Sequence, residues 1–88
     1  MNERELEKQL KALANRRRLS ILKYLKTHRE AAVSEIADAI HLSLKATSKH
    51  LRMLAALDIV EREQRSLQMF YCLAVIKSSA IKHILYLL

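Results

Sequence analysis

The sequence predicts a mainly α-helical domain with one small β-hairpin, in the order helix, helix, helix, helix, hairpin, helix. Apolar residues recur at helical spacing up to residue 57 and again from Val75. Between these two stretches lie two short β-prone runs, and Met69, Tyr71 and Leu73 occupy alternate positions in the second of them. Because 88 residues suit one domain and no linker or repeat interrupts them, residues 1–88 are expected to form a single domain.

The first two helices are predicted from their apolar faces. Four residues at i, i+4, i+7 and i+8 mark the first helix: Leu6, Leu10, Leu13 and Ala14. Asn15 is the expected N-cap of the second helix, because its side chain can accept a hydrogen bond from a free N–H of the first turn. The buried side of this helix is expected to carry Ile21, Leu22 and Leu25. Residues 27–31 are expected to form a polar break.

A short third helix and a longer fourth helix follow. The third is marked by Val33, Ile36, Ala37 and Ile40 at helical spacing. His41 and Leu42 connect it to Ser43, which is the expected N-cap of a helix over residues 44–57. One side of that fourth helix is expected to be apolar: Leu44, Thr47, Leu51, Leu54 and Ala55.

The β-hairpin is expected over residues 59–73. Its strands would be residues 59–63 and 68–73, joined by the four residues 64–67. Helical spacing returns in a last helix, whose apolar residues are Ile76, Ala80, Ile81, Ile84, Leu85, Leu87 and Leu88. Two helices joined by a short turn describe a helix-turn-helix, and a hairpin after them makes the winged form.

The charge balance indicates a nucleic-acid partner. The chain holds 16 Lys and Arg against 9 Asp and Glu, a net charge of +7. Residues 1–29 carry nine basic and three acidic residues, and residues 43–57 carry three basic residues and no acidic one. Basic charge concentrated on particular elements of a small domain is typical of proteins that bind nucleic acids.

The basic residues of the fourth helix form a stripe. Lys45, Lys49 and Arg52 lie at i, i+4 and i+7, opposite the apolar side, and Ser48 and His50 flank them. Such a helix can enter the major groove, where lysine donates to guanine O6 and N7. The alternative is an ordinary solvated charged face. The short helix before the stripe and the hairpin after it favour a recognition helix.

Other classes of protein fit the composition poorly. The chain has no glycine, which phosphate-binding loops of the P-loop and dinucleotide-binding types require. Cys72 is the only cysteine, so no disulfide can form within the chain, and a lone cysteine fits a reducing compartment. No apolar run approaches the length of a membrane span, and the N-terminus does not resemble a secretion signal. A cytoplasmic protein without a membrane partner is expected.

The sequence resembles the ArsR family of bacterial and archaeal winged-helix repressors over roughly residues 6–74. Three segments carry the resemblance: LKALANRRRLSILKYL, VSEIADAIHLSLKATSKHLRMLAALDIVERE and MFYCLA. Its most specific pieces are the AxxR pattern from Ala14 to Arg17 or Arg18, the run Ser48–Leu51, and the pair Phe70-Tyr71 that ends the wing.

The resemblance implies a homodimer that binds an imperfect palindrome in double-stranded DNA near a promoter. It implies contacts to DNA from Lys45, Ala46, Ser48, Lys49 and His50. The wing tip near Arg65 would reach the minor groove or the backbone. The first and last helices would form the dimer, and the candidate interface residues are Leu6, Leu10, Ile81, Ile84, Leu85 and Leu88.

The chain departs from the family pattern in its turns. The family usually has glycine after the third helix and before the first wing strand, where this chain has His41 and Asp58. Histidine and aspartate tolerate left-handed backbone, so both turns are expected to survive. Leu44 and Lys45 replace the glutamine and proline that often open the recognition helix, so the DNA sequence preference is expected to differ.

No metal or cofactor is expected. The positions that match the Cys-x-Cys pair of metal-sensing members are Ala32 and Ser34, and the last helix offers only His83. The four histidines, His28, His41, His50 and His83, show no i, i+4 pairing. No paired carboxylates or nucleophile-and-base spacing suggest an enzyme. A winged-helix module for protein interactions is the main alternative function, but it has no need for an acid-free basic stripe.

Two features leave alternatives open. Positive charge from Arg16, Arg17 and Arg18 in the first turn after Asn15 opposes the helix dipole. Either a bound DNA phosphate compensates it, or one arginine pairs with an acid such as Glu35 or Asp38 and the others are solvated. The last helix is apolar over more than half its circumference, which favours dimerisation over packing entirely within one chain.

Overall fold

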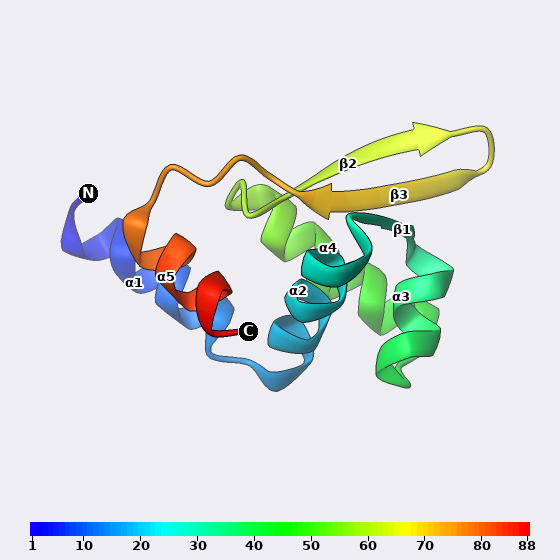
Figure 1. Cartoon of the computed structure of the whole chain (residues 1–88), viewed down its shortest axis with the longest axis horizontal. Helices are drawn as coiled ribbons and strands as arrows, with labels where there is room; N and C mark the ends of the chain where they lie inside the picture. The colour runs from blue at the N-terminus through cyan, green and yellow to red at the C-terminus, as the bar shows by residue number, and fades with distance from the viewer.

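The computed structural model describes residues 1–88 and contains five helices and one three-stranded antiparallel sheet (Figure 1). The helices are α1 (Glu3–Leu13), α2 (Arg16–His28), α3 (Val33–Ile40), α4 (Leu44–Ala56) and α5 (Ser79–Leu87). The strands are β1 (Glu30–Ala32), β2 (Val60–Arg65) and β3 (Gln68–Leu73). The predicted order of four helices, hairpin and helix is confirmed, with one strand added. No helix has the length and apolar character needed to cross a membrane.

The predicted N-caps are confirmed. The side chain of Asn15 accepts a hydrogen bond from the backbone N–H of Arg18 at 3.2 Å. The Ser43 hydroxyl accepts one from the N–H of Ala46 at 3.1 Å. Both caps satisfy donors that an unaided helix start leaves free, so they fix where α2 and α4 begin.

The turns around α4 use left-handed backbone at residues other than glycine. His41 has a φ of 56° and Asp58 a φ of 58°, as expected at the two positions where glycine is missing. His41 ends α3, and the N–H of Leu42 donates to the carbonyl of Ala37 at 3.0 Å. This turn sets the angle at which α4 leaves α3.

The prediction of a polar break over residues 27–31 was wrong in part, because residues 27 and 28 belong to α2 and residues 30–32 form β1. The sheet order is β1-β3-β2, and Ala31 lies opposite Tyr71 in the register. A strand of three residues is too short to show an alternating pattern, and its partner lies 40 positions further along the chain. Pairing with β3 therefore creates this strand, and local sequence preference does not.

Several predicted boundaries also differ, and the first wing strand spans Val60–Arg65 and not residues 59–63. The wing turn consists of Ser66 and Leu67 and not of four residues, because Ser66, with a φ of 57°, supplies the left-handed backbone of a tight hairpin. Helix α4 ends at Ala56, one residue early. Helix α5 begins at Ser79 and not near Val75; residues 74–78 are irregular, and the Ser78 hydroxyl caps the helix by accepting from the N–H of Ile81.

The core lies where α2, α3 and α4 meet the inner face of the sheet. Its largest fully buried side chains are Ile21, Leu22, Leu25, Ile36, Leu51, Leu54, Ile59, Val60 and Thr47. Leu44 was expected on the apolar side of α4 but is 57% exposed, because it stands at the first residue of the helix. The packing of Thr47, Leu51 and Leu54 into the core turns the opposite side of α4 outward.

Thr47 gives a stability prediction. Its side chain is fully buried, and its Oγ1 has no hydrogen-bond partner. Thr47→Val replaces the hydroxyl by a methyl group of similar shape, so the free energy of unfolding is expected to rise by about 1 kcal/mol or more. Urea unfolding of both proteins at one protein concentration measures this. A loss of stability would show that the hydroxyl has a partner in solution.

Candidate nucleic-acid interface

The outward side of α4 carries the predicted basic stripe. Lys45, Lys49 and Arg52 are all exposed, and none of them takes part in a hydrogen bond or ion pair within the chain. No carboxylate therefore neutralises this stripe, and its ammonium and guanidinium groups are free to donate to phosphates or base edges. Helix α4 follows α3 through a turn of three residues, which is the arrangement of a helix-turn-helix.

The other predicted residues of α4 lie at the edges of the stripe. Ala46, Ser48 and His50 are half-buried. Ser48 lines a hollow of about 290 Å³ between α4 and the wing, together with Leu44 and Leu67. His50 lies on the side of α4 that meets α2. The candidate contact residues therefore span the width of one helix face between α2 and the wing.

Arg18 joins α2 to α4 and α1. Its Nε donates to Nδ1 of His50 at 3.1 Å. Its two terminal nitrogens donate to the carbonyl of Ala12 at 3.1 Å and to the sulfur of Met53 at 3.4 Å. Burial lowers the pKa of His50, and the positive charges of Arg18, Lys49 and Arg17 lower it further. His50 is therefore held in its neutral form at neutral pH.

The ion pair that was one of the two alternatives for the arginines of α2 is absent. Arg17 donates to the carbonyl of Ile40 at 3.0 Å, and no arginine of the first turn contacts Glu35 or Asp38. The carboxylate of Glu35 instead accepts from the backbone N–H of Ala32 at 2.8 Å. Of the two alternatives, pairing with an acid was wrong, and the guanidinium groups of Arg17 and Arg18 bind neutral acceptors.

Arg65 lies next to the wing turn, as expected, but its guanidinium turns back onto the outer face of the sheet. It makes two hydrogen bonds of 2.8 Å with the carboxylate of Glu30 and one of 2.8 Å with Glu63. It also lies over the ring of Phe70, 4.6 Å from the centroid. The hydrogen bonds to Glu30 and Glu63 raise the pKa of Arg65, and the bond to Arg65 lowers the pKa of Glu30. A DNA contact by Arg65 stays a prediction, and it requires exchange of a carboxylate for a phosphate.

Sequence reasoning missed Glu30 and Glu63. Glu63 and Arg65 lie two residues apart and share one face of β2, a signal that the shorter predicted strand ending at residue 63 concealed. Glu30 had no local signal, since only the pairing of β1 with β3 brings it near the wing tip.

Cys72 lies on the same face, and burial together with Glu61, Glu30 and Glu63 raises the pKa of its thiol. Residues 1–88 contain no group of three His, Cys, Asp or Glu placed to hold a metal ion.

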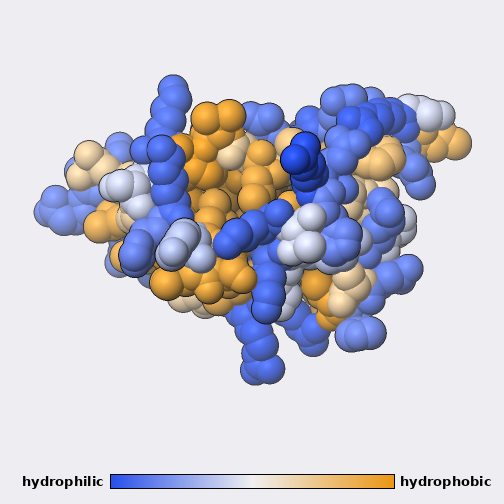
Figure 2. Space-filling model, viewed as in Figure 1, coloured by the Kyte–Doolittle hydropathy of each residue, from blue (hydrophilic) through white to orange (hydrophobic).

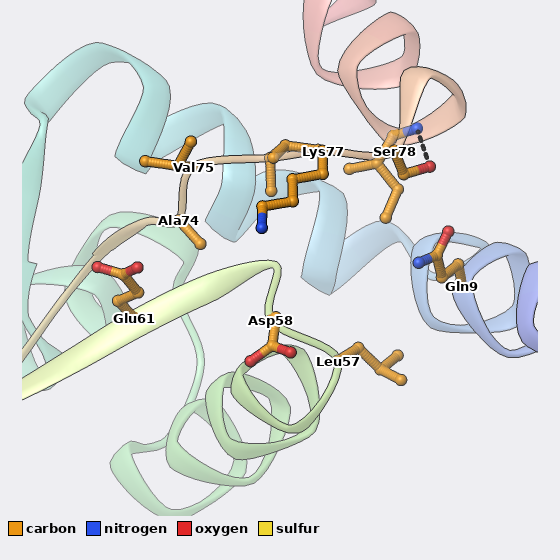
Figure 3. Close-up of a pocket in the computed structure, with 10 residues that line it drawn as sticks. Gln9, Leu57, Asp58, Glu61, Ala74, Val75, Lys77 and Ser78 are labelled. Carbon is orange, nitrogen blue, oxygen red and sulfur yellow. Dashed lines mark hydrogen bonds between the residues drawn. The ribbon is translucent and has the colours of Figure 1, made fainter. Parts of the chain in front are cut away.

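A separate cavity of about 380 Å³ lies at the opposite end of α4 (Figure 3). Gln9 of α1, Asp58 after α4, and Lys77 and Ser78 before α5 surround it (Figure 3). The side-chain oxygen of Gln9 is buried and has no hydrogen-bond partner. None of the residues predicted to bind DNA lines this cavity, so it is not part of the candidate interface.

The residues predicted for dimerisation divide into two groups. Leu6 and Leu10 on α1 are 36% and 45% exposed and do not belong to the hydrophobic core. The α5 residues pack against the core of their own chain: Ile84, Leu85 and Leu88 are half-buried there. Ile81 is only 3% exposed, so it can contribute to an interface only by packing under the residues that form it. Apolar side chains gather over α5 and the segment before it (Figure 2).

Comparison with known proteins supports the same fold and family. The family model described as "Bacterial regulatory protein, arsR family" matches residues 15–62, which include α2, α3, α4 and the start of the wing. The transcriptional activator HlyU of Vibrio cholerae is 35% identical over 93 residues, which cover 98% of this chain and 85% of HlyU.

Solved structures agree. Reduced HlyU of Vibrio cholerae superposes with a TM-score of 0.81 at 34% identity, covering 98% of this chain and 86% of HlyU. NolR of Sinorhizobium fredii gives a TM-score of 0.79 at 32% identity, covering 96% and 80%. A domain of Mycobacterium bovis, described as a homodimeric winged helix-turn-helix DNA-binding domain, gives 0.78 at 29% identity, covering 99% and 82%. The chain therefore belongs to the ArsR family and is a DNA-binding transcriptional regulator with the winged helix-turn-helix fold.

Proposed function

We propose that the protein is a homodimeric repressor that binds a specific, imperfectly palindromic site in double-stranded DNA. Helix α4 enters the major groove, and Lys45, Ala46, Ser48, Lys49, His50 and Arg52 make its contacts. The observation that carries this proposal is the outward face of α4, where three cationic side chains stand without any carboxylate partner. Action on chromosomal DNA would place the protein in the cytoplasm.

The dimer is proposed from α1 and α5. The exposed leucines of α1 and the apolar patch over α5 are apolar surfaces whose exposure to water is unfavourable (Figure 2). The related domain from Mycobacterium bovis is described as homodimeric. A two-fold dimer would present two copies of α4, and a palindromic site has the same symmetry.

The test is selection of DNA by the purified protein. Genomic fragments and random duplexes are incubated with the protein, and the retained molecules are sequenced. The proposal expects one enriched motif with two inverted half-sites about one helical turn apart. Retention without an enriched motif would contradict sequence-specific binding and favour a module for protein interactions. A reporter placed behind the selected site then shows whether the protein lowers transcription, as proposed, or raises it, as the name of HlyU implies for that relative.

The contact proposed for Arg65 gives a separate prediction. Glu30→Gln removes the carboxylate that makes two of the three hydrogen bonds to Arg65, so the two terminal nitrogens of the guanidinium become available to a phosphate while its Nε stays bound to Glu63. Affinity for DNA of any sequence is expected to rise, and the slope of log K against log salt is expected to steepen by about one. Because pairing lowers the pKa of Glu30, the ion pair is present above the ordinary glutamate pKa and is lost as the pH falls through the lowered value, so neutral buffer is appropriate.

The matched control is Glu61→Gln, which removes an equal charge from the same face without a bond to Arg65. Equal effects of Glu30→Gln and Glu61→Gln would mean that only net charge matters and that Arg65 stays on the sheet in the complex.

A further inference from the structure

Arg18 is the last of three consecutive arginines in the first turn of α2. Binding of a DNA phosphate does not by itself explain the contacts that Arg18 makes within the chain. It is half-buried, and its guanidinium donates to three residues on two other helices: Ala12 at the end of α1, and His50 and Met53 on α4. Arg16, two residues earlier on the same helix, is exposed and makes no such contact. The geometry therefore distinguishes Arg18 from its neighbour of equal charge.

The hydrogen bond from Arg18 to His50 fixes where the imidazole carries its proton. A guanidinium has only N–H donors and keeps its charge in proteins. Nδ1 of His50 lies 3.1 Å from Nε of Arg18 and must therefore accept, so it cannot carry a proton. A neutral imidazole in this contact holds its single proton on Nε2.

Nε2 of His50 is available to an external partner. It makes no hydrogen bond within the chain, and it is not among the buried polar atoms that lack a partner. His50 is adjacent in sequence to Lys49 of the basic stripe and lies at the edge of the face proposed for the major groove. An N–H at this position can donate to guanine N7 or O6, to thymine O4 or to a phosphate oxygen, and it cannot accept from an amino group.

We propose that Arg18 is a positioning residue that holds His50 as the neutral Nε2–H tautomer, so that the recognition helix presents a fixed hydrogen-bond donor to an acceptor on DNA. This inference rests on the proposed function for its DNA partner. The charges that face the imidazole come from Arg18 and Arg17 on α2 and from Lys49 on α4 itself. All three are positive and oppose a second proton on the ring.

The first test needs no DNA and no variant. In ¹⁵N-labelled protein at neutral pH, the two-bond ¹⁵N–¹H correlations of His50 distinguish its tautomers. The Nε2–H pattern is expected. An Nδ1–H pattern, or a mixture of equal parts, would overturn the inference even if the protein binds DNA. Conversely, failure to select any DNA would overturn the proposed function and leave this spectrum unchanged.

The second test compares Arg18→Met with Arg16→Met, which removes the same charge from the same turn of α2. Arg18→Met is expected to release the tautomer preference and raise the pKa of His50, because a donor to the neutral ring and a nearby cation are both lost. Arg16→Met is expected to keep the wild-type tautomer. Equal spectra for the two variants would contradict positioning by Arg18.

The third test is a double-mutant cycle on a duplex selected by the wild-type protein. Arg18→Met, His50→Ala and the double variant are titrated against it, with folding checked by circular dichroism. Each single variant is expected to lose severalfold in affinity, and the double variant to lose no more than His50→Ala alone, since Arg18 acts through His50. If the affinity losses of the two single variants multiply in the double variant, Arg18 contributes to binding independently of His50, and the inference is overturned.

Discussion

Replacing Lys49 by alanine is expected to reduce affinity for the selected duplex by about ten- to a hundredfold, while affinity for a scrambled duplex falls only a few-fold. A good contact to a base edge is worth about 1–3 kcal/mol of discrimination, whereas a phosphate contact stabilises every sequence alike. Lys49 is exposed, unpaired and in the middle of the basic stripe on α4. Its ammonium can therefore donate to a base edge without first giving up a partner.

The measurement is a titration of both duplexes at several salt concentrations. Lys82→Ala is the matched control, since Lys82 is an exposed lysine on α5, outside the proposed DNA interface. It is expected to change affinity for the two duplexes equally and little. If Lys49→Ala lowers both affinities by the same factor, Lys49 contacts phosphate. If Lys45→Ala, Lys49→Ala and Arg52→Ala all leave both affinities unchanged, α4 is not the recognition helix.

The helices of this protein could be predicted because their signals are local. Asn15 and Ser43 stand directly before the helices that they cap, and the apolar spacing of α3 and α4 extends over two or more turns. The left-handed turns at His41 and Asp58 were also predictable, once the resemblance to a family with glycine there was noticed. The elements that set the position of α4 were therefore readable from the chain.

The contacts that define the state of the site were not predictable, because they join distant residues. Arg18 and His50 are 32 positions apart, and Glu30 and Arg65 are 35 apart. Their meeting depends on how α2 packs against α4 and on the pairing of β1 with β3, which no local pattern encodes. The stripe of positive charge was visible in the sequence, but which side chains are free and which are held could be learned only from the fold.

Dimerisation offers the second large effect, and Leu10 is the residue that tests it most directly. Ile84→Glu would place a charge against the core of its own chain, so a monomer and an unfolded protein would be difficult to distinguish. Leu10 is 45% exposed on α1, and Leu10→Glu is therefore expected to leave the single chain folded. Burying an unpaired carboxylate in an apolar interface costs several kcal/mol, which is enough to separate the chains at micromolar concentration.

The wild-type protein is expected to sediment at about twice its chain mass of 10.2 kDa, and Leu10→Glu at the chain mass itself. In a dimer, once one α4 has bound its half-site, binding of the second α4 is intramolecular. The affinity for the full palindrome is therefore about two to four orders of magnitude higher than for one half-site. Leu10→Glu should therefore lose at least a hundredfold on the full palindrome and almost nothing on a duplex with one half-site. Leu67→Glu is the control for sedimentation, because Leu67 is 97% exposed at the wing turn and is expected to keep the dimer. A wild-type monomer that binds the palindrome at full affinity would refute the dimer, whereas a dimeric Leu10→Glu protein would place the interface elsewhere.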